Sequence, residues 1–541
     1  MAGEVFEDFG GIAPKIDPRR LAPNMAQVAQ DCVLDGNALE PTRTMVATAV
    51  SVGSTNNSLY RYNDATWLSY SNDRDFARAP IANDSLDRIV ITNPDAYPVV
   101  YSAGSTYRLG IPAPSTTLTA TPTETPANPD DIDAETISYV VTFVDAWGAE
   151  GPPSVPSASI DRVRDTSVNL TSLPTAPVGN YNFGSGALKR IYRSNAGTAG
   201  ANYQFVTEVA IATTSVTDST ANEDLGEILP SLTWIGPPDD DTAIYPDGPM
   251  LGITALPNGV LAGFAGKTLV FSEPYLYHAY PLDYRISFDE PIVAIAAISS
   301  GLLVVTDTKP YVVTGISPAA MAVTNLDAKQ ACVSKRGMVD MGRYAIYPSP
   351  DGLVLVEGQN VVLVTDQLFT RKQWQDNYYP TTIHAYEWEG RYIAFYNDAA
   401  GFIFDPRGGA NSFVEIGDYL EAAYFDPTED TLYVNDAGTV RAWGQGATFN
   451  SYTWKSRKAL LPKPVNFGFI RVVAHNSLAS SNVTVRIWAD GDLKITAVLN
   501  NDDSPWHPLP GGFRAKEWEI EITGTNPISH IGLFESLSEA V

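Results

Sequence analysis

A stretch of short alternating strands between Ile137 and Trp234 most constrains how this chain can fold. In it, apolar and polar residues alternate between Pro, Gly and Asn residues, which is the pattern of half-buried strands. The clearest runs are Ile137-Ser-Tyr-Val-Val-Thr-Phe-Val144, Leu188-Lys-Arg-Ile-Tyr-Arg193 and Tyr203-Gln-Phe-Val-Thr-Glu208. We therefore predict a small β-sandwich here, set inside a larger β-domain whose two parts lie before and after it.

The chain after this sandwich repeats a unit of three or four short strands about every 40 residues. Successive units begin near Leu251, Ile292, Gly337, His384 and Ala422. One blade of this kind cannot bury both of its faces, so the units are expected to close into a β-propeller. Strands between Thr44 and Ile111 supply a sixth unit or part of one. A pair of ordinary sandwiches is the rival arrangement.

The predicted fold class is all-β: a β-propeller interrupted by a β-sandwich, plus a C-terminal β-sandwich. The N-terminal arm is expected to hold one short helix, because Met25, Val28, Ala29 and Cys32 fall at i, i+3, i+4 and i+7. Asp35-Gly-Asn37 would end that helix. The expected segments are an arm (1–43), the first propeller part (44–111), a Pro- and Thr-rich linker (112–136), the inserted sandwich (137–236), the main propeller part (237–451) and the C-terminal sandwich (452–541).

The charge balance argues against a protein that grips nucleic acid. The 541 residues include 62 Asp and Glu against 35 Lys and Arg, a formal net charge of −27. Binding to a phosphate backbone needs clustered cations. The excess acid serves solubility or, more specifically, gives a surface that does not hold a polyanion.

The two cysteines, Cys32 and Cys332, lie too far apart for a disulfide framework or a metal-ligand motif. The first residues are acidic and do not resemble a signal peptide. No apolar run approaches the roughly 20 residues that span a bilayer. We expect synthesis in a cytosol and no membrane span.

No motif in the chain predicts catalysis. The five histidines form no spaced pair, and no nucleophile elbow or phosphate-binding Gly-Lys-Ser/Thr loop is present. Asp239-Asp-Asp241 could hold a cation but more simply marks a domain junction, since no calcium-loop spacing follows. Lys455 to Lys463 is a local basic stretch that could contact a phosphate backbone. A solvated edge of the protein, or a contact with an acidic neighbouring subunit, is the favoured interpretation. We expect no enzyme activity and no catalytic, cofactor-binding or metal-binding residues.

Three groups of residues resemble a known family, the tail nozzle (tail tubular protein B-like) proteins of short-tailed phages. Phe9-Gly-Gly-Ile-Ala-Pro14, followed by Ala26, Asp31, Asp35-Gly and Leu39-Glu-Pro41, resembles their N-terminal arm. The segments Ala146-Trp-Gly-Ala-Glu-Gly-Pro-Pro-Ser154, Lys189-Arg-Ile-Tyr-Arg-Ser194 and Leu225-Gly-Glu-Ile-Leu-Pro230 look like a fibronectin type III-like insert of phage structural proteins. Pro462-Lys-Pro-Val-Asn-Phe467 is similar to the start of their C-terminal region.

The resemblance implies a structural virion protein of the phage tail. It would form a ring, a hexamer, at the distal end of the tail and bind the adaptor and portal assembly. It would also anchor tail fibres or spikes, and double-stranded DNA would pass through its channel without sequence-specific binding during ejection. The alternative function is a propeller glycan-binding protein or glycosidase of the virion surface. A glycosidase needs a pair of carboxylates about 5–9 Å apart.

Overall fold

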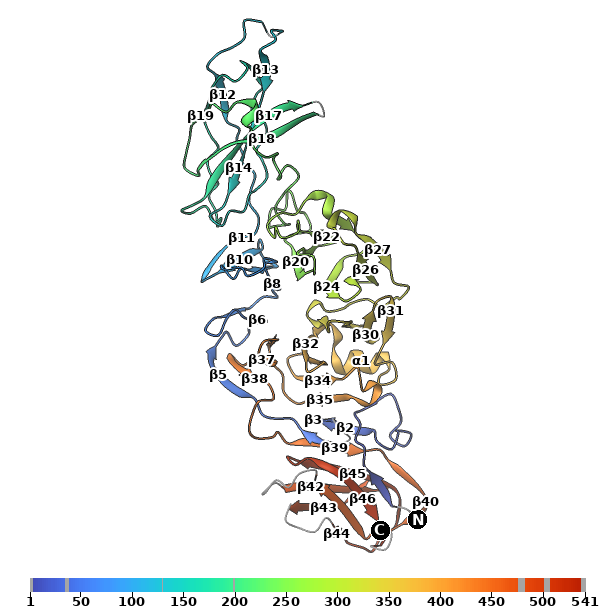
Figure 1. Cartoon of the computed structure of the whole chain (residues 1–541). Coiled ribbons are helices and arrows are strands. Elements are labelled where there is room, and N and C mark those ends of the chain that lie inside the picture. The colour runs from blue at the N-terminus through green and yellow to red at the C-terminus, as the bar shows by residue number, and fades with distance from the viewer. Residues whose placement is uncertain are drawn as a thin grey trace. The chain divides into compact units, whose positions relative to one another are not determined.

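The computed structural model describes residues 3–34, 38–128, 130–197, 200–474, 482–500 and 506–536. Nearly all regular structure in these residues is β (Figure 1), so the all-β prediction is confirmed. The chain forms two compact units. Unit 1 comprises Met1–Asp73, Ala296–Val313 and Val323–Val541, and unit 2 comprises Arg74–Ile295 and Thr314–Ala322. These boundaries differ from those of the six expected segments, and the closed propeller stays a prediction.

Unit 1 contains two separate four-stranded antiparallel sheets, built from two of the repeated units. Their strands, in spatial order, are β28 (Val339–Asp340), β29 (Ala345–Ser349), β30 (Gly352–Glu357) and β31 (Asn360–Leu363), and then β36 (Ala422–Asp426), β37 (Thr431–Asp436), β38 (Thr439–Ala442) and β5 (Val46–Ser51). The second sheet takes its edge strand from the start of the chain, since Val46 pairs with Ala442. Residues before the insert therefore complete a sheet that begins at Ala422. The hairpin β6 (Ser58–Arg61) and β7 (Trp67–Tyr70) follows β5.

A third repeated unit continues into a ten-stranded sheet, also in unit 1 (Figure 1). Its path runs through β32 (His384–Trp388), β33 (Arg391–Tyr396), β34 (Ala400–Phe404), β35 (Phe413–Ile416), β2 (Ala26–Gln30), β39 (Tyr452–Ser456), β45 (Ala515–Gly524), β42 (Asn482–Ala489) and β43 (Asp492–Asn500), with β40 (Ala459–Val465) also paired to β45. The arm strand β2 joins the repeat to the C-terminal strands. Short strands β3 (Cys32–Val33) and β4 (Glu40–Pro41) follow it.

The predicted helix in the arm is wrong, because Ala26–Gln30 is strand β2. It pairs with β39 on one side and with β35 on the other. A bulge between Ala26 and Val28 interrupts the two-residue alternation. The buried residues Ala26, Ala29 and Cys32 are consequently spaced three apart, which imitates one face of a helix. The expected helix end at Asp35-Gly-Asn37 lies outside the described residues.

The C-terminal sandwich is completed by a second sheet of β1 (Glu4–Phe6), β46 (Ile528–Phe534), β41 (Phe469–Ala474) and β44 (Trp506–Pro508). Strand β1 pairs with β46, so the two ends of the chain lie side by side. The fully buried Trp454 packs edge-on against Phe6 and Phe9, with ring centroids 5.7 and 5.1 Å apart. The sandwich is therefore built from both chain ends and not from residues 452–541 alone.

An α-helix that was not expected from the sequence, α1 (Arg371–Tyr378), follows β31 in unit 1. Thr370 and Gln373 form a capping box at its start, which satisfies free backbone N–H groups. Trp374 and Tyr378, four residues apart, lie on its buried face. Short 3₁₀ turns elsewhere in unit 1 are η5 (Lys335–Gly337), η6 (Pro380–Thr382) and η7 (Gly409–Asn411).

Unit 2 contains the inserted sandwich. Its strands are β12 (Thr119–Pro122), β16 (Val168–Thr171) and β19 (Val216–Asp218) in one sheet, β14 (Tyr139–Val144), β17 (Leu188–Gly197) and β18 (Gly200–Ala210) in another, and the pair β13 (Ala134–Ile137) and β15 (Ile160–Val163). Tyr139, Val141, Leu170 and Ile191 are buried together in its core. The turn η2 (Asn222–Asp224) follows β19.

The prediction of a linker over 112–136 is wrong, because β12 and β13 lie within it. Strand β12 is an edge strand that pairs only with β16. An edge strand can accept Pro122, whose missing N–H would break a central ladder. Proline content is therefore compatible with a strand here, and Leu118 just before it is buried in the sandwich core. Pro129 lies outside the described residues.

Unit 2 also contains two four-stranded sheets outside the insert. They are β8 (Phe76–Arg78), β9 (Ile89–Ile91), β10 (Val99–Ser102) and β11 (Ser105–Arg108), and β20 (Leu251–Ala255), β21 (Leu261–Ala265), β22 (Thr268–Phe271) and β23 (Arg285–Ser287). Residues before the insert, such as Val90 and Val100, share a core with residues after it, such as Leu261 and Tyr280. The turns η3 (Leu282–Tyr284) and η4 (Pro318–Ala320) belong to this unit.

The remaining repeated unit is the sheet β24 (Ile292–Ile298), β25 (Gly301–Thr306), β26 (Pro310–Thr314) and β27 (Ala322–Asn325). Its residues are divided between the two compact units. The sheets that begin at β20, β24, β28, β32 and β36 each contain the consecutive strands of one repeated unit, and the β32 sheet continues beyond its unit through a parallel pairing of β35 with β2.

Candidate functional site

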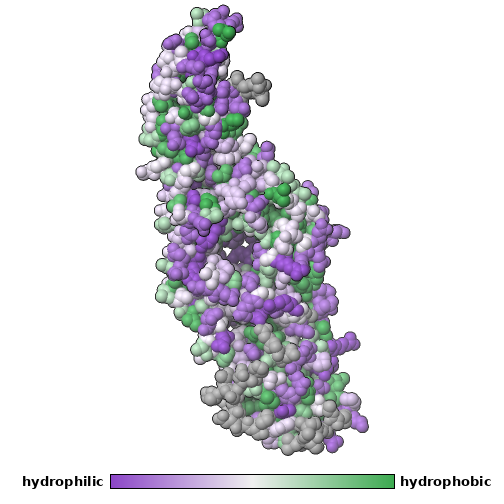
Figure 2. Space-filling model, viewed as in Figure 1, coloured by the Kyte–Doolittle hydropathy of each residue, from purple (hydrophilic) through white to green (hydrophobic). Residues whose placement is uncertain are grey.

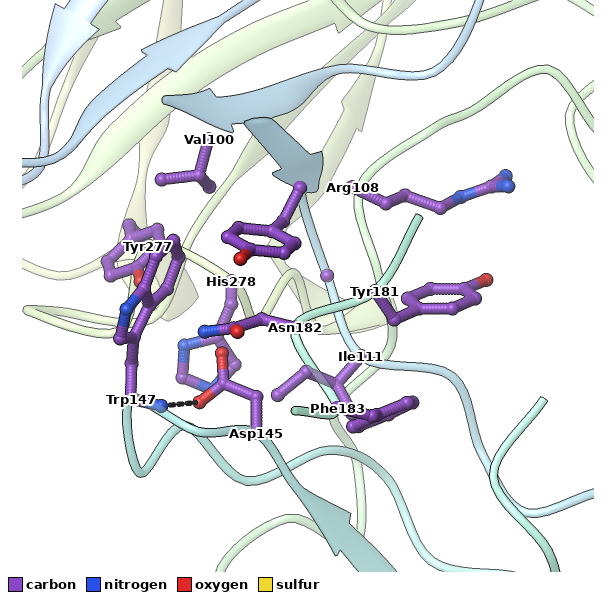
Figure 3. Close-up of a pocket in the computed structure, with 12 residues that line it drawn as sticks. Val100, Arg108, Ile111, Asp145, Trp147, Tyr181, Asn182, Phe183, Tyr277 and His278 are labelled. Carbon is purple, nitrogen blue, oxygen red and sulfur yellow. Dashed lines mark hydrogen bonds between the residues drawn. The ribbon is translucent and has the colours of Figure 1, made fainter. Parts of the chain in front are cut away.

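A buried polar joint in unit 2 links the inserted sandwich to the β8–β11 sheet (Figure 3). The turn after β14, the loop that carries Asn182 and the loop that carries His278 meet there. Its lining residues are Val100, Tyr107, Arg108, Gly110, Ile111, Asp145, Trp147, Tyr181, Asn182, Phe183, Tyr277 and His278. The enclosed space is about 10 Å³, which is about the room needed for one water molecule. The joint is too small to be a substrate cleft.

Asp145 organises the turn on the sandwich side of this joint. One of its carboxylate oxygens accepts hydrogen bonds from the backbone N–H groups of Trp147 (2.9 Å) and Ala149 (2.8 Å). The residue is 8% exposed, and burial raises the pKa of its carboxyl to about 6 despite these hydrogen bonds. The Asp-Ala-Trp-Gly turn is therefore held by a carboxylate that is costly to ionise.

On the other side of the joint, His278 forms a hydrogen bond to the backbone of the insert. Its Nε2 lies 3.0 Å from the carbonyl oxygen of Glu150, so Nε2–H donates and the ring is the neutral tautomer with its proton on Nε2. Burial lowers its pKa to about 4. Its Nδ1 and the Nδ2 of Asn182, which lines the same space, have no hydrogen-bond partner among the described residues. The arrangement fixes the inserted sandwich to the rest of unit 2. A neutral imidazole in this environment is poorly suited to proton transfer at neutral pH.

Arginine side chains flank the joint. The Arg88 guanidinium bonds both carboxylate oxygens of Asp84, at 2.8 and 2.9 Å, and lies 5.6 Å from the ring centre of Trp147. It also contacts Tyr277. The paired cation therefore contacts one aromatic ring from the insert and one from the chain after it.

The acidic run Asp239-Asp-Asp241 also has a cationic partner from within unit 2. Arg108 Nη2 lies 2.7 Å from Asp239 and 2.9 Å from Asp240. The same guanidinium is 4.2 Å from the ring centre of Tyr97. The cation that this run holds is therefore an arginine. Within the residues that the structure covers, no cluster of three or more metal-type ligands occurs.

The basic stretch at Lys455 is paired with acidic residues of β45. Lys458 lies 3.2 Å from both Glu517 and Glu519, and Lys455 lies 3.1 Å from Glu519. Arg19 of the arm adds a further ion pair to Glu517 at 2.7 Å. Three cations thus converge on two carboxylates within one unit. Phosphates, a solvated edge and an acidic neighbouring subunit were the partners considered from the sequence. In the structure, Lys455 and Lys458 pair instead with acidic residues of the same unit.

The other described histidines lie in three different strands, β32, β44 and β46. His384 is buried with Nδ1 3.3 Å from the Tyr386 hydroxyl, and burial lowers its pKa well below the ordinary value. His530 lies 3.3 Å from Glu7. His507 is in strand β44, and His475 lies outside the described residues. Cys32 and Cys332 are free and buried.

No residue of the polar joint was predicted from the sequence to be functional. Asp145 and His278 are far apart in the sequence, and each is unremarkable by itself. Only the Asp-Ala-Trp-Gly segment gave a signal, since an aspartate two residues before a turn amide commonly forms such a turn.

Comparisons with known proteins give no family assignment. No protein-family model and no curated protein matches the chain. Solved structures with some likeness include the computationally designed Ika8 protein, with 11% identity, a TM-score of 0.29, and coverage of 74% of this chain and 99% of that one. A structure of BBS1N in complex with ARL6DN gives 8% identity, a TM-score of 0.29, and coverage of 76% and 99%. BamB from Moraxella catarrhalis gives 9% identity, a TM-score of 0.25, and coverage of 68% and 96%.

Across the residues for which positions are described, no helix has both the length and the apolar character needed to cross a bilayer.

Proposed function

We propose that this chain is a structural protein of a short phage tail, in the position of the nozzle, through which DNA passes without being held. The proposal places it in a ring of copies, most simply a hexamer, in the virion. Its partners would be the adaptor and portal assembly on one side and tail fibres or spikes on the other. Synthesis would take place in the cytoplasm of the host bacterium.

The observation that carries the proposal is that cations of the chain form ion pairs with its own carboxylates. In the basic stretch, Lys455 and Lys458 form ion pairs with Glu517 and Glu519. Arg108 forms ion pairs with Asp239 and Asp240. Figure 2 shows hydrophilic residues over much of the face in view, interspersed with smaller apolar groups. A net charge of −27, with these cations paired internally, repels duplex DNA, which carries a charge every ~1.7 Å.

The arm that carries the family resemblance also has a physical role in unit 1. The carbonyl of Gly10 accepts a hydrogen bond from Trp454 Nε1 at 3.1 Å. A Cβ at Gly11 would lie 2.2 Å from the carbonyl oxygen of Phe413. The Phe-Gly-Gly segment is therefore required for close packing of the arm, which supports treating it as a structural motif of a rigid β body.

A DNA-binding measurement tests this reading. We expect the purified chain to give no mobility shift of duplex DNA even at ~20 mM salt, where counterion release most favours binding. The double variant Glu517→Gln/Glu519→Gln frees three cations, and we expect it to gain weak binding that falls steeply with salt. The double variant Glu223→Gln/Asp224→Asn changes the same number of charges on an exposed turn and should not bind. Tight binding by the unmodified chain at ~0.15 M salt would contradict the proposal.

A further inference from the structure

A polar cavity of about 260 Å³ lies in unit 1 between the N-terminal arm and the ends of strands from the ten-stranded sheet. The arm supplies Asp8, Phe9 and Asn24. The sheet side supplies Trp388, Arg391, Asp405, Asn411 and Ser412. The volume is below the range of about 300–1,000 Å³ that suits drug-sized ligands, so it suits a smaller molecule.

The polar groups of this wall are held in place by the fold. Asn24 Nδ2 donates to the Asp8 carboxylate at 3.1 Å. The backbone carbonyl of Asn411 accepts from Gly11 N–H at 2.7 Å, which fixes the η7 turn against the arm. Ser412 Oγ donates to the carbonyl of Asp405 at 2.6 Å. Each of these side chains retains further hydrogen-bonding capacity, since an amide offers two donors and a carboxylate about four acceptor sites.

The charges around the cavity nearly balance. Arg391, which is 6% exposed, is 2.8 Å from Glu389 and 3.6 Å from Asp405, and it stacks 5.0 Å from the Trp388 ring centre. Arg407 bonds Asp405 at 2.7 Å. Two carboxylates, Glu389 and Asp405, pair with two guanidiniums here, and Asp8 adds a third carboxylate. An anionic ligand would meet surplus carboxylate, and a small cation would meet two arginines.

We propose that this cavity binds a neutral polyhydroxylated ligand of the size of one sugar residue. Neighbouring hydroxyls both donate and accept, which matches the mixture of carboxylate oxygens on Asp8 and amide groups on Asn24 and Asn411. Phe9 and Trp388 give the wall an apolar component for the C–H faces of a sugar ring. Small polar ligands of this size bind with Kd values of roughly 1 mM. The inference is independent of the nozzle proposal and of DNA passage.

The test is saturation-transfer NMR on the full chain with neutral sugars as probes. The probes are D-glucose, D-galactose, L-rhamnose and N-acetyl-D-glucosamine, with glucose 6-phosphate and glucosamine as charged counterparts. The variants Asp8→Asn and Asn411→Ala change exposed side chains of the wall. Asn360→Ala, on the exposed edge strand β31 of the same unit, is the matched control.

We expect saturable binding of at least one neutral sugar, a Kd roughly threefold to tenfold weaker in each wall variant, and no change in the control. Circular dichroism and a thermal melt establish that each variant is folded. Three results would overturn the proposal: no saturable binding of any neutral sugar up to ~50 mM, well above the expected Kd; binding that both wall variants leave unchanged; or tighter binding of glucose 6-phosphate than of glucose. None of these results bears on the DNA measurement.

Discussion

The inserted sandwich of unit 2 and the C-terminal sandwich of unit 1 have the same architecture, but their strands come from different parts of the chain. The insert is made from one continuous stretch, and its core contains a buried ion pair, Arg193 with Asp218, whose side chains are both 0% exposed. The C-terminal sandwich takes β1 and β2 from the other end of the chain and buries Trp454 and Trp518. Its ion pairs join buried Glu517 and Glu519 to cations that still reach solvent. One sandwich is independent in sequence, and the other depends on chain closure.

The largest expected effect separates the two sandwiches as isolated fragments. We expect residues 114–235 to fold alone, because the paired strands β12 to β19 and their core lie within this stretch. Residues 452–541 alone are expected to remain unfolded, because β1 and β2 are missing and Trp454 loses Phe6, Phe9 and the Gly10 carbonyl. Amide dispersion in NMR spectra reads out both fragments. A folded C-terminal fragment would contradict the claim of dependence.

Breaking the buried pair of the insert is expected to have the next largest effect. Asp218 accepts from Arg193 at 2.6 Å and from the Tyr139 hydroxyl at 2.8 Å. In Asp218→Ala the Arg193 guanidinium stays buried without its counterion, which costs about 3–5 kcal/mol. Urea unfolding of the 114–235 fragment measures this loss. The control is Thr217→Ala, which changes the exposed residue next to Asp218. It should change the unfolding free energy by less than about 1 kcal/mol.

The polar joint that attaches the insert gives two opposing pH effects. The raised pKa of Asp145 contributes stability that is fully present below pH 3.8 and lost as pH rises through about 6. The lowered pKa of His278 contributes stability that is present above pH 6.5 and lost as pH falls through about 4. Each amounts to about 3 kcal/mol, so the two nearly cancel between pH 4 and 6.

Single substitutions at the joint should expose each slope. Relative to the unmodified chain, Asp145→Asn is expected to gain stability as pH rises from 4 to 6, because only the His278 effect remains. His278→Gln is expected to lose stability over the same range. Melting temperatures measured at several pH values, each taken as a difference from the unmodified chain, give the slopes. Parallel curves for all three proteins would show that neither group is coupled to folding.

The smallest effect is expected at the C-terminal ion network. Lys458 shares Glu519 with Lys455, and Glu517 with Arg19, so its loss leaves both carboxylates with a cation. Lys458→Met should therefore change the unfolding free energy by at most about 1 kcal/mol. A loss as large as that of Asp218→Ala would mean that the two networks are alike and would remove the contrast between the sandwiches.

The same contrast explains what could be read from the sequence. In the insert, Val168–Thr171 alternates regularly, with Val168 and Leu170 buried, whereas Tyr139–Val144 is buried at every position. Short apolar runs bounded by turn residues made strands predictable there. Strand β2 was not predictable, because its bulge disguises the alternation and its partners β35 and β39 lie hundreds of residues away. The joint of Asp145 with His278 and the pairing of Lys458 with Glu519 depend on such distant contacts. Sequence periodicity carries no information about which distant strands meet.

The most direct test of the central claim is to locate the chain in phage particles from its source. Mass spectrometry of gradient-purified virions and electron microscopy with gold-labelled antibodies against the chain would be used together. We predict that the chain is present in several copies per particle and that gold lies at the distal end of a short tail. A chain that is produced during infection but is missing from purified, infectious particles would contradict the account.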